Sequence, residues 1–226
     1  MTVEIALRAA RVRYGPLEAL HGLDLPVPAA TVTVLLGRNG AGRTSALRAL
    51  AGAVPLSAGR VVWRGADVTR LPAHERARRG LCLVPDLRAV YATLTVAENL
   101  ALAPGDPAEA LDAYPALIPL LARRAGTLSG GERRMLAVSR ALLTPAARVV
   151  LVDEPTLGMS PPVAARTYGL LAKLATRGGA AVVLAEQRLP PPGGLPRGTL
   201  VHELRRGSLV FSGEPPELTS STRESR

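Results

Sequence analysis

A short apolar run that stops abruptly at a glycine-rich loop sets the fold class of this 226-residue chain. Residues 31–36 read Thr-Val-Thr-Val-Leu-Leu, the loop covers residues 37–45, and a helical pattern continues through residues 46–53. A β-branched and apolar run without alternation is typical of a strand that is buried on both faces. Strand, glycine-rich loop and helix in this order form the context that a phosphate-binding loop requires.

The loop itself reads Gly-Arg-Asn-Gly-Ala-Gly-Arg-Thr-Ser. Its glycines allow successive backbone N–H groups to turn inward around phosphate oxygens, and the helix N-terminus adds about half a positive charge. We therefore predict that the loop binds a nucleoside triphosphate and that the Thr44 hydroxyl coordinates Mg²⁺. A glycine-rich turn without a ligand is the alternative. The candidate binding residues are Gly37, Asn39, Gly40, Ala41, Gly42, Arg43, Thr44 and Ser45.

One position of this loop departs from the usual pattern, because Arg43 stands where a phosphate-binding loop has lysine. A lysine ammonium is a compact point charge, whereas a guanidinium is planar, bulkier and prefers bidentate contacts. We expect nucleotide to bind through the backbone amides and Mg²⁺, but more weakly, and we expect hydrolysis to be slowed.

A second apolar run ends in two carboxylates. Residues 148–152 are expected to form a buried strand, and Asp153 and Glu154 follow it directly. Successive strand residues point to opposite sides, so the two acids can take different roles at the carboxyl end of the strand. Asp153 is the candidate Mg²⁺ ligand, and Glu154 is the candidate general base that orients water. A solvated acidic turn is the alternative.

The third motif is Leu-Ser-Gly-Gly-Glu at residues 128–132, directly before a helical pattern over residues 133–143. Ser129 stands where a helix N-cap is expected, and Gly130 and Gly131 leave backbone amides open. These residues and Glu132 form a candidate second anion site. An ordinary helix cap is the alternative when the pentapeptide is taken alone.

The remaining pattern alternates strands with helices around a helical stretch at residues 95–143, which predicts an α/β fold with a mainly parallel sheet. Three consecutive prolines within residues 189–196 exclude a helix there. Residues 219–226 are polar and expected to fray. The expected strands are residues 3–14, 21–27, 60–63, 81–84, 180–185, 199–204 and 208–212, with a further helix at residues 163–175.

Composition bears on partners and location. The net charge is +10, but all except one of the 28 basic residues are arginines scattered along the chain, and aromatic residues make up 3 %. Few aromatic side chains are therefore available to stack on bases, which weighs against a nucleic-acid partner. A lone cysteine, no apolar run near the roughly 20 residues that span a bilayer, and no secretory pattern at the N-terminus lead us to expect a cytoplasmic protein.

Taken together, the three motifs resemble the ATP-binding subunits of ABC transporters, over residues 3–213. Further stretches resemble the branch that takes up branched-chain amino acids. Those stretches lie at residues 14–22, 84–85, 94–100, 125–132, 157–161 and 185–187.

The resemblance implies a P-loop NTPase (RecA-like) ABC ATPase core with a mainly parallel sheet, an N-terminal antiparallel β subdomain and an inserted helical subdomain. The core would comprise residues 1–85 and 145–218, and the helical subdomain residues 86–144, within a single ABC ATPase domain. It also implies ATP and Mg²⁺ as cofactors, and a dimer in which each ATP lies between the phosphate loop of one subunit and residues 128–132 of the other.

The resemblance assigns three further residues. Tyr14 would stack on the adenine ring, although an aromatic packed on the core is the alternative. Asp86 falls in the loop that senses the γ-phosphate, where the family commonly has Gln, or Glu in this branch, and its shorter side chain puts its reach in doubt. Gln187 falls at the switch position, where its amide can hydrogen-bond the γ-phosphate but cannot accept a proton.

The function that the resemblance implies is a peripheral ATPase subunit on the cytoplasmic face of the membrane, which powers import of branched-chain amino acids. Its partners would be membrane permease subunits that dock near residues 86–104, a second ATP-binding subunit and, indirectly, a solute-binding protein. Two alternatives remain. One is a degenerate regulatory subunit with weak or no hydrolysis, and the other is a soluble ABC ATPase that acts on nucleic acid.

Overall fold

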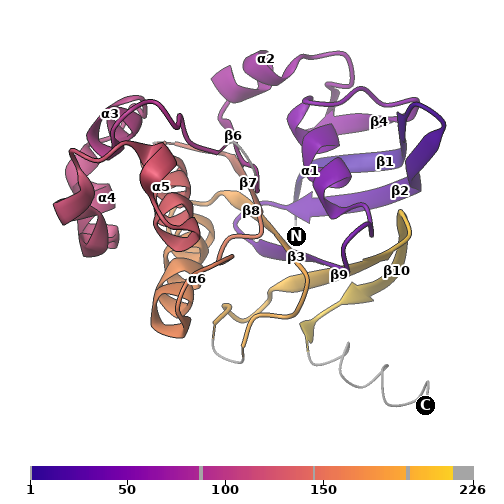
Figure 1. Cartoon of the computed structure of the whole chain (residues 1–226). Helices are drawn as coiled ribbons and strands as arrows, with labels where there is room; N and C mark the ends of the chain where they lie inside the picture. The colour runs from indigo at the N-terminus through magenta and orange to yellow at the C-terminus, as the bar shows by residue number, and fades with distance from the viewer. Residues whose placement is uncertain (1, 87–88, 145, 192–193, 216–226) are drawn as a thin grey trace.

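The computed structural model describes residues 2–86, 89–144, 146–191 and 194–215, and it contains two β-sheets with helices between and beside them (Figure 1). Six strands form the larger sheet in the order β10-β9-β3-β8-β7-β6. The pairs that β3, β6, β7, β8 and β9 make with one another are parallel, and β10 pairs antiparallel with β9. The strands are β3 (Val32–Leu36), β6 (Leu81–Val84), β7 (Val149–Asp153), β8 (Ala181–Glu186), β9 (Leu200–Arg205) and β10 (Ser208–Gly213).

The smaller sheet is antiparallel and has the order β2-β1-β4-β5. It contains the expected N-terminal hairpin, which turns at Gly15, although the second strand begins four residues earlier than the sequence indicates. Its strands are β1 (Val3–Tyr14), β2 (Leu17–Pro28), β4 (Ala58–Trp63) and β5 (Ala66–Asp67).

Helix α1 lies between the two sheets, whereas α5 and α6 cover the opposite face of the larger sheet (Figure 1). Helix α2 connects the smaller sheet to β6, and α3, α4 and the two 3₁₀ helices η1 and η2 lie between β6 and α5. The helices are α1 (Arg43–Ala51), α2 (Ala73–Arg78), α3 (Val96–Ala101), α4 (Pro107–Ala113), η1 (Pro115–Leu120), η2 (Ala125–Thr127), α5 (Gly130–Leu142) and α6 (Pro161–Thr176).

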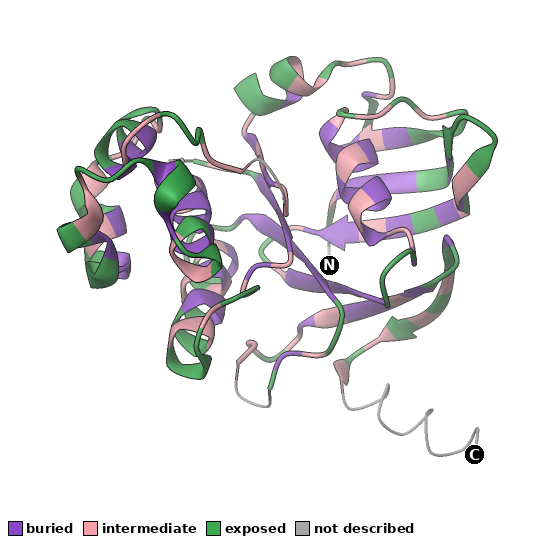
Figure 2. Ribbon diagram, in the orientation of Figure 1, coloured by how far each residue is buried: buried purple, intermediate pink, exposed green. Residues whose placement is uncertain are grey.

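The central strands are buried on both faces, as their apolar runs predict (Figure 2). Successive side chains of β7 alternate between two cores: Val149 and Leu151 pack with α1 and the smaller sheet, whereas Val150 and Val152 pack with the helical region. This alternation follows from the period of two along a strand. The carboxyl ends of β3, β6, β7 and β8 are thereby fixed along one edge of the sheet.

The expected α/β order with a mainly parallel sheet is confirmed. The helix after the phosphate loop begins at Arg43, three residues earlier than expected, because the loop turns directly into it. The described residues of the 189–196 segment contain no helix, and the terminal hairpin forms as β9 and β10. Residues 219–226 lie outside the part of the chain that the structure describes. Within the described ranges, no helix is both long and apolar enough to cross a bilayer.

Candidate functional site

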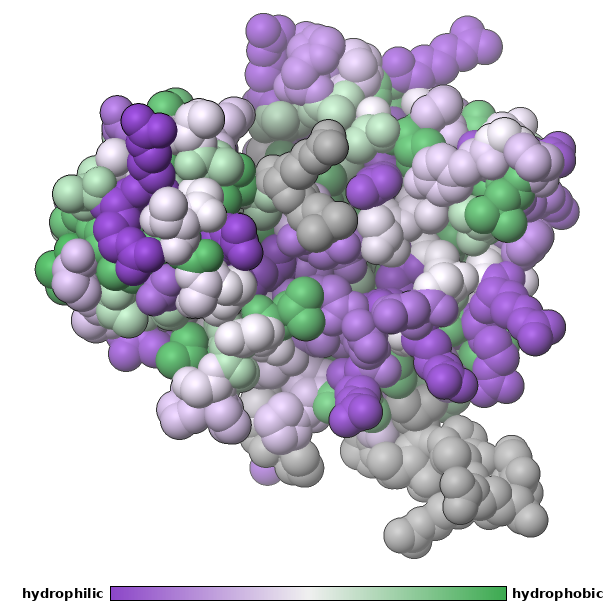
Figure 3. Space-filling view, in the orientation of Figure 1, coloured by the Kyte–Doolittle hydropathy of each residue, from purple (hydrophilic) through white to green (hydrophobic). Residues whose placement is uncertain are grey.

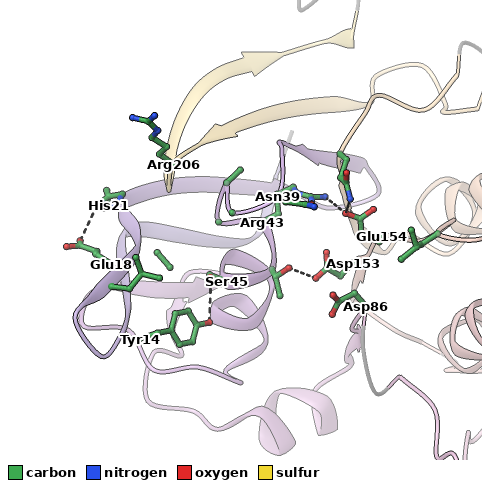
Figure 4. Close-up of a pocket in the computed structure, with 18 of the residues that line it drawn as sticks. Tyr14, Glu18, His21, Asn39, Arg43, Ser45, Asp86, Asp153, Glu154 and Arg206 are labelled. Carbon is green, nitrogen blue, oxygen red and sulfur yellow. Dashed lines mark hydrogen bonds and ion pairs between the residues drawn. The ribbon is translucent and has the colours of Figure 1, made fainter. Parts of the chain in front are cut away.

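A pocket of about 930 Å³ lies where four parallel strands of the larger sheet end (Figure 4). The loop after β3, Asp86 after β6, the end of β7 and Gln187 after β8 all contribute to its wall. This is the edge at which open α/β sheets bind ligands. The residues of the sequence prediction that line it are Tyr14, Asn39, Gly40, Ala41, Gly42, Arg43, Thr44, Ser45, Asp86, Asp153, Glu154 and Gln187.

The phosphate loop owes its shape to two glycines. Gly42, the N-cap of α1, has a φ of 103°, and a Cβ there would lie 2.9 Å from the carbonyl oxygen of Ala19. Gly37 does not line the pocket, but a Cβ on it would lie 2.7 Å from the carbonyl oxygen of Leu204. No side chain caps α1, so the first N–H groups of the helix remain available to an anion.

Arg43 is the first residue of α1, and its side chain extends to the Glu154 carboxylate, just beyond β7. Its Nη1 donates to Glu154 Oε1 at 2.8 Å, and its Nη2 donates to Asn39 Oδ1 at 3.4 Å. Arg43 as a whole is 6 % exposed, so water screens this ion pair far less than a surface pair. The cation that replaces the usual lysine thus contacts the candidate general base directly.

Thr44 and Asp153 form the candidate magnesium site. The Thr44 hydroxyl donates to Asp153 Oδ2 at 2.6 Å, and both side chains face the pocket. Burial raises the pKa of Asp153, while the Thr44 hydrogen bond opposes that shift. A hydroxyl and a carboxylate fit Mg²⁺, which is commonly held by one or two carboxylates together with substrate phosphates. Among the described residues, no cluster of three or more His, Cys, Asp or Glu could hold a metal by itself.

Glu154 lies just beyond β7 and adopts a left-handed backbone conformation, with a φ of 52°. Its Oε1 accepts hydrogen bonds from Arg43 and, at 3.1 Å, from the Gln187 side-chain amide. Strain of this kind in a non-glycine residue is concentrated at functional sites. The sequence predicted that these two consecutive residues point to opposite sides. The left-handed turn at Glu154 instead brings both Asp153 and Glu154 to the same pocket, where they keep different hydrogen-bond partners.

A further carboxylate, Glu186, lies at the end of β8, close enough to Glu154 for their charges to interact. Burial raises the pKa of Glu186 to about 7, and the nearby charge of Glu154 acts in the same direction. The Tyr168 hydroxyl of α6 donates to Glu186 Oε1 at 2.5 Å and lies 3.1 Å from the Thr156 hydroxyl. Sequence reasoning missed Glu186 because it reads as the polar end of an apolar strand.

The rim of the pocket is formed by the turn between β1 and β2 and by the β9–β10 turn. Tyr14 is 40 % exposed, and its hydroxyl lies 3.4 Å from Ser45 Oγ, so its ring is accessible from the pocket. Arg206 reaches the pocket because Gly207 N–H donates to the carbonyl of Ala41. The rim residues that the sequence prediction did not include are Pro16, Leu17, Glu18, Ala19, His21, Leu157 and Arg206.

The second glycine-rich motif does not line the pocket. Ser129 caps α5 as expected: its Oγ accepts the N–H of Glu132, and the Glu132 carboxylate accepts the N–H of Ser129, which makes a capping box. A Cβ on Gly131 would lie 2.5 Å from the carbonyl oxygen of Gly158, so this motif packs against the segment that follows Glu154. Ser129, Gly130, Gly131 and Glu132 are therefore separate from the phosphate loop within one chain.

A glycine-rich loop that joins a buried strand to a helix, at the carboxyl edge of a mainly parallel sheet, places the chain among the P-loop nucleotide-binding proteins. A profile described as "ABC transporter" matches residues 20–157. The chain is 35 % identical to the Archaeoglobus fulgidus protein named "Probable branched-chain amino acid transport ATP-binding protein LivF", over 91 % of this chain and 89 % of that one. The chain belongs to the ABC transporter family, as one of its ATP-binding subunits.

Further relatives and solved structures agree with this assignment. A Pseudomonas aeruginosa protein named "High-affinity branched-chain amino acid transport ATP-binding protein BraG" is 34 % identical, over 77 % of this chain and 78 % of that one. A crystal structure of a nucleotide-free ATP-binding cassette from an ABC transporter superposes with a TM-score of 0.80 at 22 % identity, covering 99 % of this chain and 96 % of that one. That likeness shows a common fold.

Proposed function

We propose that this chain hydrolyses ATP in the pocket at the carboxyl edge of the larger sheet. The observation that carries the proposal is the convergence of three separate segments of the chain on one pocket: the phosphate loop with Thr44, the end of β7 with Asp153 and Glu154, and Gln187 after β8. A hydrolytic site for phosphoryl groups needs little covalent chemistry from the protein, and positioning with charge stabilisation supplies most of the catalysis. These four side chains are suited to both.

Each side chain has a role that its contacts support. Glu154 orients the attacking water and accepts its proton, and the Gln187 amide holds Glu154 Oε1. Asp86, beside Asp153 in Figure 4, lines the pocket, where it would contact the γ-phosphate. Thr44 and Asp153 would hold Mg²⁺, which supplies charge neutralisation on the phosphates when it is bound. Tyr14 offers its exposed ring to the adenine, and Asn39 to Ser45 surround the phosphates.

Arg43 sets the rate in this proposal. The guanidinium that should contact phosphate is bonded to Glu154, so nucleotide must share or displace that ion pair before Glu154 can act as a base. We propose that hydrolysis is therefore slower than with lysine at this position. Comparing Mg-ATP affinity and turnover in the wild type and in Arg43→Lys tests this. Faster turnover in the variant supports the proposal, and equal values contradict it.

The ATPase assignment has its own test in Glu154→Gln. This substitution keeps the size of the side chain and removes its ability to accept a proton. We expect turnover to fall by about 100-fold or more, where about 100-fold is the lower end of what general acid–base catalysis contributes, while Mg-ATP still binds. Turnover that persists unchanged in the variant would mean that Glu154 is not the base.

One observation favours a second candidate function. Because Arg43 already neutralises Glu154, the chain also fits a regulatory subunit that binds ATP and hydrolyses it weakly or not at all. The retained carboxylate argues against that candidate, since an inactive subunit has no need of a general base. ATP binding without turnover in the wild type, even when its partner subunits are present, would favour the regulatory subunit.

We further propose that this ATPase subunit powers import of branched-chain amino acids from the cytoplasmic face of the membrane. Support comes from the printed names of the LivF and BraG relatives, which align over most of this chain. None of the pocket residues selects a transported solute. Uptake of labelled leucine, isoleucine and valine in cells with and without the gene tests this proposal directly, and unchanged uptake would contradict it.

The proposed docking site for the membrane permease is a cavity of about 160 Å³ where β6 meets α3 and α5. It is lined mainly by apolar side chains, among them Cys82, Ala89, Leu102 and Ala141. Leu102 is 54 % exposed, and apolar residues also show at the edge of the helical region in Figure 3. Leu102→Glu should abolish co-purification with permease subunits and leave the ATPase activity of the isolated subunit intact. Salt-sensitive RNA binding in place of permease binding would instead favour a nucleic-acid role.

The second proposed partner is another ATP-binding subunit. The capped start of α5 lies outside the pocket, which supports contact of Ser129 and Gly130 with a nucleotide held by a neighbouring subunit. We propose that ATP closes a dimer across the two motifs. Light scattering of Glu154→Gln with and without Mg-ATP tests this, because slow hydrolysis preserves the closed form. A mass that stays monomeric at saturating ATP, alone and with permease subunits, would contradict it.

A further inference from the structure

Arg134 of α5 is buried close to the acids Asp153, Asp86, Glu186 and Glu154, whose charges act on it. It is 5 % exposed, and its Nε has no hydrogen-bond partner among the described residues. Burial lowers the pKa of Arg134, and the charges of Asp153, Asp86, Glu186 and Glu154 oppose that shift. A buried cation is costly unless the structure uses it. Nothing in the proposed hydrolysis assigns a role to this side chain.

Within the described residues, the two hydrogen bonds of the Arg134 guanidinium go to backbone carbonyls. Nη1 donates to the oxygen of Pro85 at 2.6 Å, and Nη2 donates to the oxygen of Asp153. The β6–β7 ladder has Val84 and Val152 as its last pair, so these carbonyls follow directly where the two strands cease to bond. The fork of Arg134 therefore joins the ends of β6 and β7 beyond their ladder.

The two carbonyls that Arg134 contacts each belong to a peptide unit that leads to a pocket carboxylate. A peptide unit is planar, so holding the carbonyl of residue i also fixes the N–H and Cα of residue i+1. The carbonyl of Pro85 belongs to the peptide that leads to Asp86, and the carbonyl of Asp153 belongs to the peptide that leads to Glu154. Arg134 thus holds the two peptide planes from which the pocket carboxylates project.

We propose that Arg134 is a positioning residue for hydrolysis, which fixes Asp86 and Glu154 relative to each other through these two peptide planes. The inference rests on the proposed ATPase function and deepens it. It also ties the acids to α5, which begins at the capped Ser129 motif, so that a shift of this helix reaches both carboxylates.

Two substitutions distinguish the effect of the forked donor geometry of the Arg134 guanidinium from the effect of its positive charge. Lysine keeps the positive charge but is a point donor that cannot serve both carbonyls with fork geometry. Methionine keeps an unbranched stem and removes both the charge and the donors. Arg133→Met is the matched control, because Arg133 is the adjacent exposed arginine on the same helix.

The experiment measures steady-state hydrolysis and direct Mg-ATP binding for the wild type and the three variants. We expect Arg134→Lys to lower kcat by about 30-fold, within the range that a misplacement of about 1 Å produces, with KM and Kd changed less than about threefold. Arg134→Met should lower kcat at least as much and also weaken Mg-ATP binding by about tenfold, since the acids then repel the phosphates. Arg133→Met should match the wild type.

Three outcomes would overturn the proposal. Arg134→Lys with wild-type kcat would show that the fork does no positioning, and an effect confined to KM would assign Arg134 to nucleotide binding. Failure of Arg134→Lys to fold, seen as loss of its cooperative thermal transition, would assign the residue to stability alone. Absence of hydrolysis in the wild type would instead reject the proposed ATPase function, which keeps the two failures distinct.

Discussion

The two glycine-rich helix starts in this chain are built in opposite ways. The phosphate loop enters α1 through Gly42, with no side-chain cap, no acid in the first turn and a buried cation at its first residue. The motif before α5 enters through Ser129, with a complete capping box and its own carboxylate, Glu132, in the first turn. One helix start is open and lies among buried charges, and the other is closed and exposed.

The comparison shows that two similar glycine-rich motifs differ in how many backbone N–H groups the fold leaves free to bind an anion. At α1 the unbonded N–H groups and the helix dipole both face the pocket, so an anion completes the helix end. At α5 the cap already satisfies the N–H of Glu132, and the Ser129 hydroxyl retains its own proton to donate. The α1 start can therefore bind phosphate by itself, whereas the α5 start contributes to a site that another surface must complete.

The largest predicted effect concerns the glycines of the two starts. Gly42→Ala places a Cβ 2.9 Å from the carbonyl oxygen of Ala19 at a φ of 103°, so the loop must change its conformation. We expect the Kd for Mg-ATP to rise by about 100-fold, equivalent to about 3 kcal/mol. Titration with a fluorescent ATP analogue measures this.

Gly130→Ala is the matched control for that substitution. A Cβ on Gly130 meets no atom within 4 Å, and its backbone does not adopt a positive φ. We expect the Mg-ATP affinity of the isolated subunit to stay within about twofold of the wild type. Equal losses in the two variants would show that both helix starts bind nucleotide within one chain, and the comparison would fail.

The second prediction is that the pH dependence of the free energy of unfolding comes from Glu186, at the end of β8, and not from the Glu132 carboxylate at the start of α5. The pKa of Glu186 is about 7 in the folded chain and ordinarily 4.5, so folding takes up a proton between these values. The free energy of unfolding should therefore fall as pH rises from 5 to 8, by about 3 kcal/mol from this residue. Glu186→Gln, which carries no charge at any pH, should not show that part of the decrease. Urea denaturation at the two pH values measures the difference.

Glu132→Gln is the control for the closed start. Glutamine also completes a capping box, and this side chain lies near the surface. We expect it to keep the pH dependence of the wild type between pH 5 and 8. The raised pKa of Asp153 acts in the same direction in every variant. A wild-type pH dependence in Glu186→Gln would show that Glu186 is not the responsible group.

Local sequence patterns predicted much of this architecture because local physics decides it. The β-branched run before Gly37 has no polar side to expose, so it becomes a central strand. Ser129, followed three residues later by Glu132, carries its own cap. The three prolines after β8 remove donors that a helix needs, and the described residues of that segment form none.

The contacts that the sequence did not reveal all join segments that are distant along the chain. Arg43 and Glu154 are 111 residues apart, and Arg134 reads as an ordinary basic residue in a helical pattern until β6 and β7 place two carbonyls beside it. The β9–β10 turn contacts the phosphate loop through Gly207 and Ala41, which no local signal indicates. Such pairings depend on strand order, which is a property of the whole sheet.

The smallest predicted effect tests the closed start itself. Ser129→Ala removes the oxygen that accepts the N–H of Glu132, so we expect the free energy of unfolding to fall by about 1 kcal/mol, as for other helix caps. Ser129→Thr, which keeps a capping hydroxyl, should lose only a few tenths of a kcal/mol. Because Ser129 does not line the pocket, Mg-ATP affinity of the isolated subunit should be unchanged in both variants, as measured by titration beside urea denaturation. Weaker Mg-ATP binding in Ser129→Ala at an unchanged monomeric mass would mean that this hydroxyl contacts the nucleotide of its own chain. The starts of α1 and α5 would then bind the same nucleotide within one chain, and not two nucleotides across a dimer.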